Sequence, residues 1–288
     1  MTSPFQVYRP GTISDAASLL RELDDEAAFY CGGTELLQIM KMGLADFSHL
    51  IDLKSVAGLG GISLADDGSL SIGATVTHRE IERSPLIRER LPALASLERH
   101  VANVRVRNAG SIGGNLCFAE PHSDPAALLV AAGAFVHLSD ARQARRVPLV
   151  DFLVGPMATV RELDEILVRI EVPVQPDGTI LAYRKIVFYE RPAASVAVRL
   201  TVEGGRVGSA SVVVGSVGER PLIIGEAEAA LVGVRVTDSS EAVEAAAAAA
   251  ASGCDAYGDI NGSEEYKRHL VAVLTRRAIG AAVEQADA

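Results

Sequence analysis

Two pairs of adjacent glycines are the residues whose type and spacing suggest ligand binding. The first pair lies in "YCGGTELL" and the second in "GSIGGNLC"; each follows a cysteine or an apolar residue and precedes a small polar residue. Because glycine has no Cβ atom, main-chain amides at such a place can reach an oxyanion at contact distance. Two such loops facing one another would hold a pyrophosphate without lysines. A single Gly-Gly before a helix more often serves only to form a turn. The residues alone therefore leave both a structural turn and a ligand-binding loop open.

The first glycine pair precedes a predicted helix over residues 34–42. Thr34 would open this helix, and a helix N-terminus carries free N–H groups and a partial positive charge that favour phosphate. Neither loop has the pattern GxGxxG or GxxxxGK[ST], and the spacing lacks the βαβ unit that those motifs require. The loops therefore do not match the nicotinamide-type or P-loop nucleotide sites.

The composition predicts a folded protein with a sizeable core. Of the 288 residues, 49% are hydrophobic and 22% are charged. The formal net charge of -10 argues against a nucleic-acid role, which needs a basic face to neutralise phosphates. The N-terminus lacks a signal-peptide pattern and no apolar run reaches membrane-spanning length, so we expect a cytoplasmic protein without a transmembrane segment. Three widely spaced cysteines predict neither a disulfide framework nor a metal or iron–sulfur site.

Hydrophobic periodicity and turn residues outline the elements that must position the loops. Ser14 is the expected N-cap of a first helix, and a helical stretch over 78–98 carries two proline breaks. A hairpin is expected around Gly204-Gly205, and helices from about residue 225 to the end, the last with Tyr266 and Leu270 near one face. The prolines and glycine of 173–178 suggest a domain boundary. The other expected strands cover residues 27–30, 49–53, 69–76, 165–173 and 179–188.

The two glycine-rich segments together resemble a known pair of signatures. "YCGGTELLQIMKMG" and "RNAGSIGGNLCFAEPHSDPAALLVAAGA" resemble the two FAD-binding signatures of the medium subunit of molybdenum hydroxylases. This is the flavoprotein subunit of the carbon monoxide dehydrogenase and xanthine dehydrogenase family. Further resemblances are spread in order along nearly the whole chain: "FQVYRPGTISDAASLL", "SIGATVTHREI", "DEILVRIEVP", "SVVVGSVGERPLIIGEAEAAL" and "YKRHLVAVLTRRAI".

The resemblance implies an α+β fold with two domains. Residues 1–175 would form an FAD-binding domain of the PCMH/VAO-like type, with two small α/β subdomains at about 1–55 and 56–175. Residues 176–288 would form a C-terminal domain with a three-stranded antiparallel sheet and a helical bundle. The strand-then-helix pattern of 179–285 agrees with the second part.

The resemblance also implies which residues bind FAD. In relatives the two loops grip the pyrophosphate and ribityl chain, an acidic residue hydrogen-bonds the cofactor, a strand backbone meets the adenine or flavin edge, and a lysine lies near the isoalloxazine ring. No catalytic residue and no metal ligand is expected on this chain. The matching positions are Cys31, Gly32, Gly33, Thr34, Glu35, Ser111, Ile112, Gly113, Gly114, Asn115, Asp124, Leu167 and Lys185.

Several positions keep a second interpretation. Asp124, followed by Pro125, could equally be the N-cap of the next helix. A lysine in a strand, such as Lys185, is usually on a solvated face. Relatives often have Gly-Asp-Phe or Gly-Asp-Tyr after the lysine strand, where this chain has Arg191-Pro192. This position therefore offers no aromatic side chain to stack on the flavin. Tyr189 is the candidate to take over that role.

The function implied by the resemblance is electron transfer. This chain would carry FAD and pass electrons from [2Fe-2S] clusters of a small subunit to an external acceptor, while a large molybdopterin subunit oxidises the substrate. A dimer of heterotrimers is expected, cytoplasmic or peripheral at the inner membrane face. The alternatives are a stand-alone flavin oxidoreductase of the same fold class and a flavin-free assembly subunit. Because the substrate pocket lies on another chain, carbon monoxide, a purine, an aldehyde and an N-heterocycle are all compatible substrates.

Overall fold

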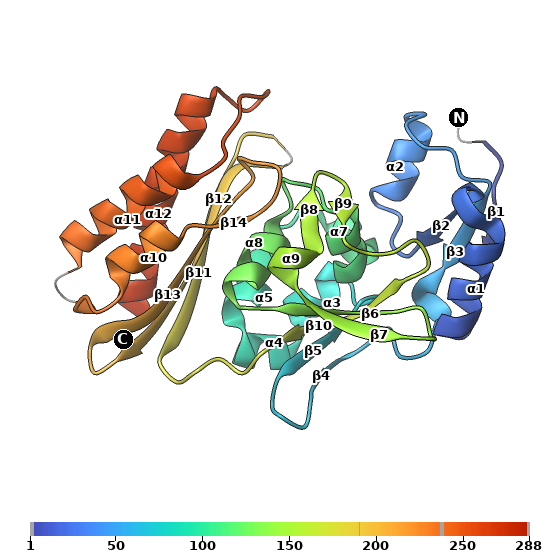
Figure 1. Cartoon of the computed structure of the whole chain (residues 1–288), viewed down its shortest axis with the longest axis horizontal. Coiled ribbons are helices and arrows are strands. Elements are labelled where there is room, and N and C mark those ends of the chain that lie inside the picture. The colour runs from blue at the N-terminus through green and yellow to red at the C-terminus, as the bar shows by residue number, and fades with distance from the viewer. Residues whose placement is uncertain (1–2, 190, 237–238, 287–288) are drawn as a thin grey trace.

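Three sheets follow one another along the chain (Figure 1). The structure is a computed structural model that describes residues 3–189, 191–236 and 239–286. The sheet orders are β1-β3-β2, β4-β5-β10-β6-β7 and β11-β12-β13-β14, with a two-stranded β8-β9 ribbon beside the second. This mixture of helix and strand confirms the expected α+β class. Among the described residues, no helix has the length and hydrophobicity needed to cross a membrane.

The N-terminal sheet is parallel and places the first glycine loop after its strand β2. Helix α1 begins two residues earlier than an N-cap at Ser14 would allow, because Thr12 is the N-cap and its hydroxyl accepts a hydrogen bond from the amide of Asp15 at 3.1 Å. The Ser14 prediction was therefore wrong. The elements are β1 (Gln6–Tyr8), α1 (Ile13–Leu23), β2 (Ala27–Tyr30), α2 (Leu36–Lys41) and β3 (His49–Asp52).

The central region combines an antiparallel sheet with a group of short helices. Prolines 85 and 92 each stand in the first turn of a new helix, so the stretch 78–98 is three helices, as its two proline breaks predicted. The elements are β4 (Ile62–Leu64), β5 (Leu70–Gly73), α3 (His78–Arg83), α4 (Pro85–Arg90), α5 (Pro92–Glu98), α6 (Val104–Ala109), α7 (Ile112–Phe118), α8 (Asp124–Ala131), β6 (Phe135–Ser139), β7 (Ala144–Pro148), α9 (Leu149–Phe152), β8 (Leu153–Gly155), β9 (Ala158–Thr159) and β10 (Ile166–Val172).

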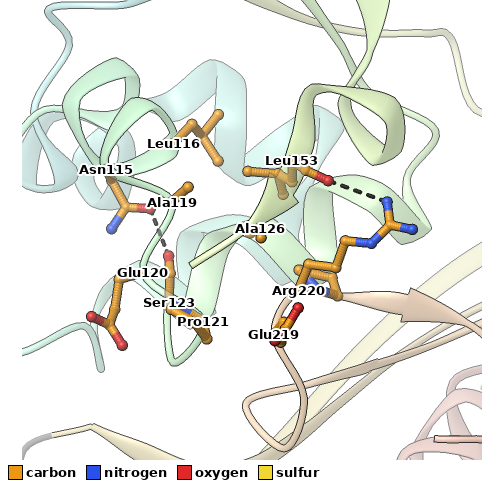
Figure 2. Close-up of a pocket in the computed structure, with 12 residues that line it drawn as sticks. Asn115, Leu116, Ala119, Glu120, Pro121, Ser123, Ala126, Leu153, Glu219 and Arg220 are labelled. Atoms are coloured by element: carbon orange, nitrogen blue, oxygen red, sulfur yellow. Dashed lines mark hydrogen bonds between the residues drawn. The ribbon is translucent and has the colours of Figure 1, made fainter. Parts of the chain in front are cut away.

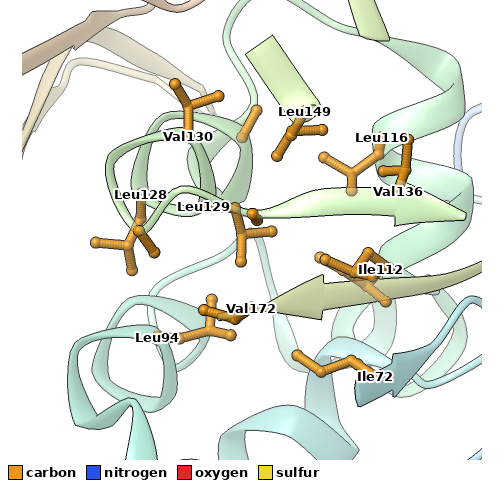
Figure 3. Close-up of a cluster of buried hydrophobic side chains, with 14 of the residues drawn as sticks. Ile72, Leu94, Ile112, Leu116, Leu128, Leu129, Val130, Val136, Leu149 and Val172 are labelled. Atoms are coloured by element: carbon orange, nitrogen blue, oxygen red, sulfur yellow. The ribbon is translucent and has the colours of Figure 1, made fainter. Parts of the chain in front are cut away.

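Helix α7, which carries the second glycine pair, is anchored in the largest core. Figure 3 shows Ile112 and Leu116 of this helix close to Ile72, Val136 and Val172 of three neighbouring strands. All five side chains are buried. Helix α8 lies deeper still, with every residue buried, because the central core covers one side of it and the C-terminal sheet the other.

The C-terminal sheet lies between α8 and the last helices (Figure 1). The hairpin is confirmed: Gly204 and Gly205 have φ of 55° and 75°, a left-handed geometry that suits glycine. The sheet has a fourth, two-residue edge strand that pairs with Val213 and Val214, so the expectation of three strands was incomplete. The elements are β11 (Thr179–Val187), β12 (Pro192–Glu203), β13 (Arg206–Gly215), β14 (Leu222–Ile223), α10 (Gly225–Leu231), α11 (Ser240–Gly253) and α12 (Glu264–Ala286).

The buried face of α12 differs from the predicted one near its N-terminal end. Tyr266 is 41% exposed, whereas the adjacent Lys267 is completely buried. The ammonium group of Lys267 lies 2.7 Å from a carboxylate oxygen of Asp259 and over the ring of Tyr257. Leu270 is buried as predicted. The hydrophobic periodicity assigned Tyr266 to the core, but the neighbouring Lys267 is buried instead, in an ion pair.

Candidate functional site

The two glycine loops lie directly side by side. A Cβ atom on Gly32 would clash with the carbonyl oxygen of Ala109, and one on Gly110 would come within 3.3 Å of the Thr34 hydroxyl oxygen. Burial raises the pKa of the Cys31 thiol, and a hydrogen bond with the Ser111 hydroxyl partly offsets that rise. These contacts join residues about 80 positions apart in the sequence. The fold thus brings together the two loops that the sequence singled out.

Three backbone amides of the first loop have no protein acceptor among the described residues. Gly33 has φ of 68°, in the left-handed region that favours glycine. Within the ranges that the structure describes, the amides of Gly33, Thr34 and Glu35 donate no hydrogen bond. Helix α2 begins at Leu36 and has six residues, so the prediction that Thr34 opens it was wrong by two residues. The free amides therefore belong to the turn and not to the helix.

The second loop is different, because its amides are already bonded. Ile112 and Gly113 donate to the carbonyl oxygens of Val76 and Ala74, both at 2.9 Å. Gly114 donates to the Ser111 hydroxyl at 3.2 Å, and Asn115 donates to the Ser111 carbonyl at 2.9 Å. Ser111 is thus the N-cap of α7. The expectation that both loops expose bare amides holds for the first loop only.

Gly113 has a packing role of its own. A Cβ atom there would lie 2.6 Å from the Cβ of Ala74 and 2.7 Å from its carbonyl oxygen. A Cβ on Gly114 would meet only the Ser111 hydroxyl, at 2.9 Å. The side chain of Ile112 is fully buried and faces the core. Contacts between a ligand and Ile112, Gly113 or Gly114 therefore stay a prediction.

Asp124 and Lys185, predicted from separate segments, form a direct ion pair. The carboxylate of Asp124 accepts from Lys185 Nζ at 2.7 Å and from the Tyr183 hydroxyl at 2.6 Å. Lys185 also donates to the carbonyl oxygen of His100 at 2.9 Å. Burial raises the pKa of Tyr183 well above its ordinary value, and the carboxylate adds to that rise, so the phenol stays a donor. Lys185 is not on a solvated face.

Asp124 is not the N-cap of its helix. Ser123 occupies the N-cap position of α8, and Asp124 is the first helical residue. The Ser123 hydroxyl donates to the side-chain oxygen of Asn115 at 2.6 Å, which ties the second loop to the start of α8 (Figure 2). The carboxylate of Asp124 is thus free to receive Lys185 and Tyr183 from β11.

Leu167 lies apart from these residues. Its side chain is 3% exposed in the central core, and its backbone pairs with Leu138 of β6 next to a bulge. Only the backbone of Leu167 could meet a ligand without opening the core. Its predicted contact with the cofactor stays a prediction.

Two side chains beside the loops, Glu120 and Arg191, were missed as site residues, whereas their partner Glu35 was among the predicted ones. Arg191 Nη2 lies 3.0 Å from Glu35 Oε2, and Arg191 Nη1 pairs with Glu120 Oε2. Burial acts to raise the pKa of Glu120, but hydrogen bonds from His122 and Arg191 and the arginine's charge outweigh it and lower the pKa to about 2. The sequence signal was present only as the unusual Arg191-Pro192. Tyr189 is 72% exposed.

A buried pair under the second loop was also missed. His78 Nδ1 lies 2.7 Å from Glu98 Oε2, with both side chains almost inaccessible to solvent. Burial acts to lower the pKa of His78, but the Glu98 carboxylate outweighs it and raises the pKa. The amide of His78 donates to the carbonyl oxygen of Gly110 at 3.1 Å. The pair therefore supports the chain just before the second loop.

A separate pocket lies beside the connection between α7 and α8 (Figure 2). Asn115 of α7 and Glu120 just after it contribute to the pocket, as do Glu219 and Arg220 from the connection between β13 and β14. Arg220 donates to the carbonyl oxygen of Leu153 at 3.2 Å. No first-loop residue lines this pocket, so it is not the space between the two glycine loops.

Comparison with protein families gives two matches that together span most of the chain. The family described as "FAD binding domain in molybdopterin dehydrogenase" matches residues 3–175. The family described as "CO dehydrogenase flavoprotein C-terminal domain" matches residues 189–282.

Individual relatives agree with these families. The carbon monoxide dehydrogenase medium chain of Hydrogenophaga pseudoflava is 33% identical over 281 residues, which is 96% of each chain. The nicotine 6-hydroxylase medium subunit of Paenarthrobacter nicotinovorans is 34% identical over 274 residues, 94% of each chain.

Solved structures show the same likeness over the whole fold. The carbon monoxide dehydrogenase of H. pseudoflava superposes with a TM-score of 0.94 at 33% identity, and covers 99% of both chains. Quinoline 2-oxidoreductase from Pseudomonas putida 86 superposes with a TM-score of 0.91 at 29% identity, also over 99% of both chains. The chain belongs to the family of FAD-binding medium subunits of molybdenum hydroxylases, which are oxidoreductase subunits.

Proposed function

We propose that this chain holds FAD between its two glycine loops and transfers electrons from [2Fe-2S] clusters of a small subunit to an external acceptor. One observation carries the proposal. The loops lie side by side, and three consecutive amides of the first, at residues 33–35, have no acceptor within the described part of the chain. Buried or half-buried amides normally find partners, so a run of free N–H groups at this place favours an anionic ligand.

The residues present fit the pyrophosphate of FAD. Gly33 is left-handed and has no Cβ, so its turn can present successive N–H groups to phosphate oxygens. The second loop supplies the wall against which the first is packed, through Gly110 and Ser111. Backbone recognition also suits a chain with a net charge of -10. When bound, FAD would supply both one-electron and two-electron chemistry, which suits a link between iron–sulfur clusters and an acceptor.

Asp124 and Lys185 fit the role of orienting residues. Tyr183 donates to Asp124, and the carbonyl oxygen of His100 accepts from Lys185, so each charged group has a second protein partner that holds it in place. We propose that this held cation and carboxylate set the place of the flavin end of the cofactor, as the family resemblance implies. Leu167 would contribute only through its backbone.

The medium-subunit relatives support a heteromeric complex. We propose a small [2Fe-2S] subunit and a large molybdopterin subunit as partners, assembled as a dimer of heterotrimers. We also propose that residues 1–175 and 176–288 are the two domains. The free cysteines Cys31, Cys117 and Cys254 favour a cytoplasmic location. The names of the relatives refer to carbon monoxide, nicotine and quinoline, so we propose that the substrate is selected on another subunit.

The test is retention of FAD by the full chain. The purified protein is incubated with FAD, separated from excess by gel filtration, and measured for its visible spectrum and its extracted FAD. We expect one FAD per chain, and loss of at least tenfold in affinity for Gly33→Val.

Gly43→Val is the matched control. Gly43 is also left-handed, with φ of 72°, but a Cβ there meets nothing within 4 Å. It therefore carries the same backbone strain away from the loops. A folded wild-type chain that takes up no FAD, alone or in the complex purified from its source, would contradict the proposal.

A further inference from the structure

Arg191 connects the segments that carry the two glycine loops. Its guanidinium is held by both carboxylate oxygens of Glu35, at 3.0 and 3.1 Å, and by the carboxylate of Glu120. Glu35 is the last residue of the turn with the free amides, and Glu120 lies two residues after the end of α7. Arg191 itself immediately precedes β12 of the C-terminal sheet. One side chain thus links its own segment to two others that are distant in the sequence.

Burial makes these contacts stronger than ordinary surface ion pairs. The side chain of Glu120 is 16% exposed, that of Glu35 34% and that of Arg191 42%. Half-buried charges are screened less than exposed ones. The two terminal nitrogens of Arg191 are also divided between the carboxylates, Nη2 with Glu35 and Nη1 with Glu120, and charge-assisted hydrogen bonds are stronger than neutral ones. Glu120 is held on its other side by His122, whose second ring nitrogen lies 3.4 Å from Asp259. Glu120 is therefore fixed in place independently of Arg191.

The position of Glu35 creates an electrostatic problem for an anionic ligand. Its carboxylate belongs to the same turn as the free amides of Gly33 and Thr34, so a bound pyrophosphate would lie close to a negative charge. Glu120 adds a second negative charge nearby. Like charges a few ångströms apart repel strongly in a partly desolvated site. Arg191 is the cation that contacts both carboxylates.

We propose that Arg191 is a positioning residue of the cofactor site, which neutralises Glu35 and Glu120 so that the first loop can accept the pyrophosphate of FAD. The inference rests on the proposed function and goes beyond it, because it assigns the charge balance of the site to a residue outside both loops. A purely structural Arg191 would change stability and leave the affinity for FAD and its salt dependence unchanged.

The experiment measures the dissociation constant of FAD from the full chain by flavin fluorescence, at low and at high salt. Arg191→Met keeps the length of the side chain and removes its charge. We expect at least a tenfold weaker affinity at low salt. The loss should be smaller at high salt, because salt screens part of the repulsion between the pyrophosphate and the partly exposed carboxylates of Glu35 and Glu120. Arg191→Lys should recover most of the affinity. Thermal unfolding of each apo-protein checks that the variants are folded.

A rescue variant separates charge from structure. The triple variant combines Arg191→Met with Glu35→Gln and Glu120→Gln, so neither carboxylate is left to repel the ligand. We expect its affinity for FAD to be within threefold of wild type. Arg276→Met is the matched control, since Arg276 is 41% exposed and pairs with Glu244 on the C-terminal helices. It should bind FAD like wild type.

The outcomes distinguish the two proposals. Normal FAD affinity in Arg191→Met, or an equal loss at all salt concentrations that the glutamines do not restore, overturns the role of Arg191 and leaves the FAD site intact. If Arg191→Met does not fold, Arg191→Gln, which also removes the charge, takes its place under the same criteria, and Arg191→Lys remains the variant that keeps the charge. A wild-type chain that binds no FAD overturns both.

Discussion

The two glycine loops look alike in sequence and do opposite things in the structure. In the second loop every amide from Ile112 to Asn115 donates to a protein acceptor, and Gly113 lets the chain pack against Ala74. In the first loop the amides of residues 33–35 have no such acceptor in the described ranges. The second loop is therefore part of the scaffold, and the first is suited to bind. The role of a Gly-Gly pair follows from where its backbone hydrogen bonds go.

The scaffold role of the second loop predicts the largest effect. His78→Leu leaves the Glu98 carboxylate buried without its partner, and we expect a loss of about 3–5 kcal/mol in the free energy of unfolding. Urea denaturation measures it. The double variant His78→Leu/Glu98→Leu should recover part of the loss, because no isolated charge remains. A double variant less stable than the single one would contradict this account.

Gly113→Val tests the packing of the second loop directly. The new side chain meets the backbone of Ala74, which cannot move away cheaply, so we expect a loss of about 3 kcal/mol or an unfolded protein. Gly11→Val, at a position with open space around it, should cost far less. Equal stability of the two variants in denaturation would show that the close packing of Gly113 against Ala74 does not contribute to stability.

The pH dependence of stability tests the ionic contacts of Glu120, which follows the second loop. Its pKa falls from the ordinary 4.5 to about 2 on folding. A lowered folded pKa stabilises the protein above the unfolded pKa, and the gain is lost as the pH falls from about 4.5 to about 2. Glu120→Gln should remove about 2 kcal/mol of that pH dependence. Unfolding free energies between pH 2.5 and 7 measure it, and parallel curves for variant and wild type would refute it.

Gly114→Ala should have the smallest effect. Alanine is favoured over glycine within α7 by about 1 kcal/mol, and crowding of the capping Ser111 hydroxyl costs a similar amount. We expect a change below about 1 kcal/mol in denaturation. A loss as large as that of Gly113→Val would mean that both glycines of the pair are packing residues.

Much of the architecture was predictable because it depends on local patterns. The proline breaks of 78–98, the hairpin at Gly204-Gly205 and the strand before the first loop follow from properties of a few neighbouring residues. The short strand β14 was missed because two residues have no periodicity of their own. Lys267 was missed because a lysine is buried only when a distant partner, here Asp259, is brought to it.

The candidate site was predictable as a set of segments and not as a set of interactions. The residue types of the loops, together with the family resemblance, identified Gly33, Asp124 and Lys185. The resemblance gave no reason to expect that Lys185 and Asp124 pair with each other. It marked Arg191 only as unusual.

The amino-acid sequence alone sets which residues can take a left-handed or close-packed backbone, and hence where the two loops lie in the chain. Folding sets which loop keeps amides without an acceptor among the described residues, and which charges meet, as Arg191 meets Glu35 and Glu120. The physical reason is that backbone conformation depends on adjacent residues. Hydrogen-bond satisfaction and ion pairing depend on groups that folding brings together from far along the chain.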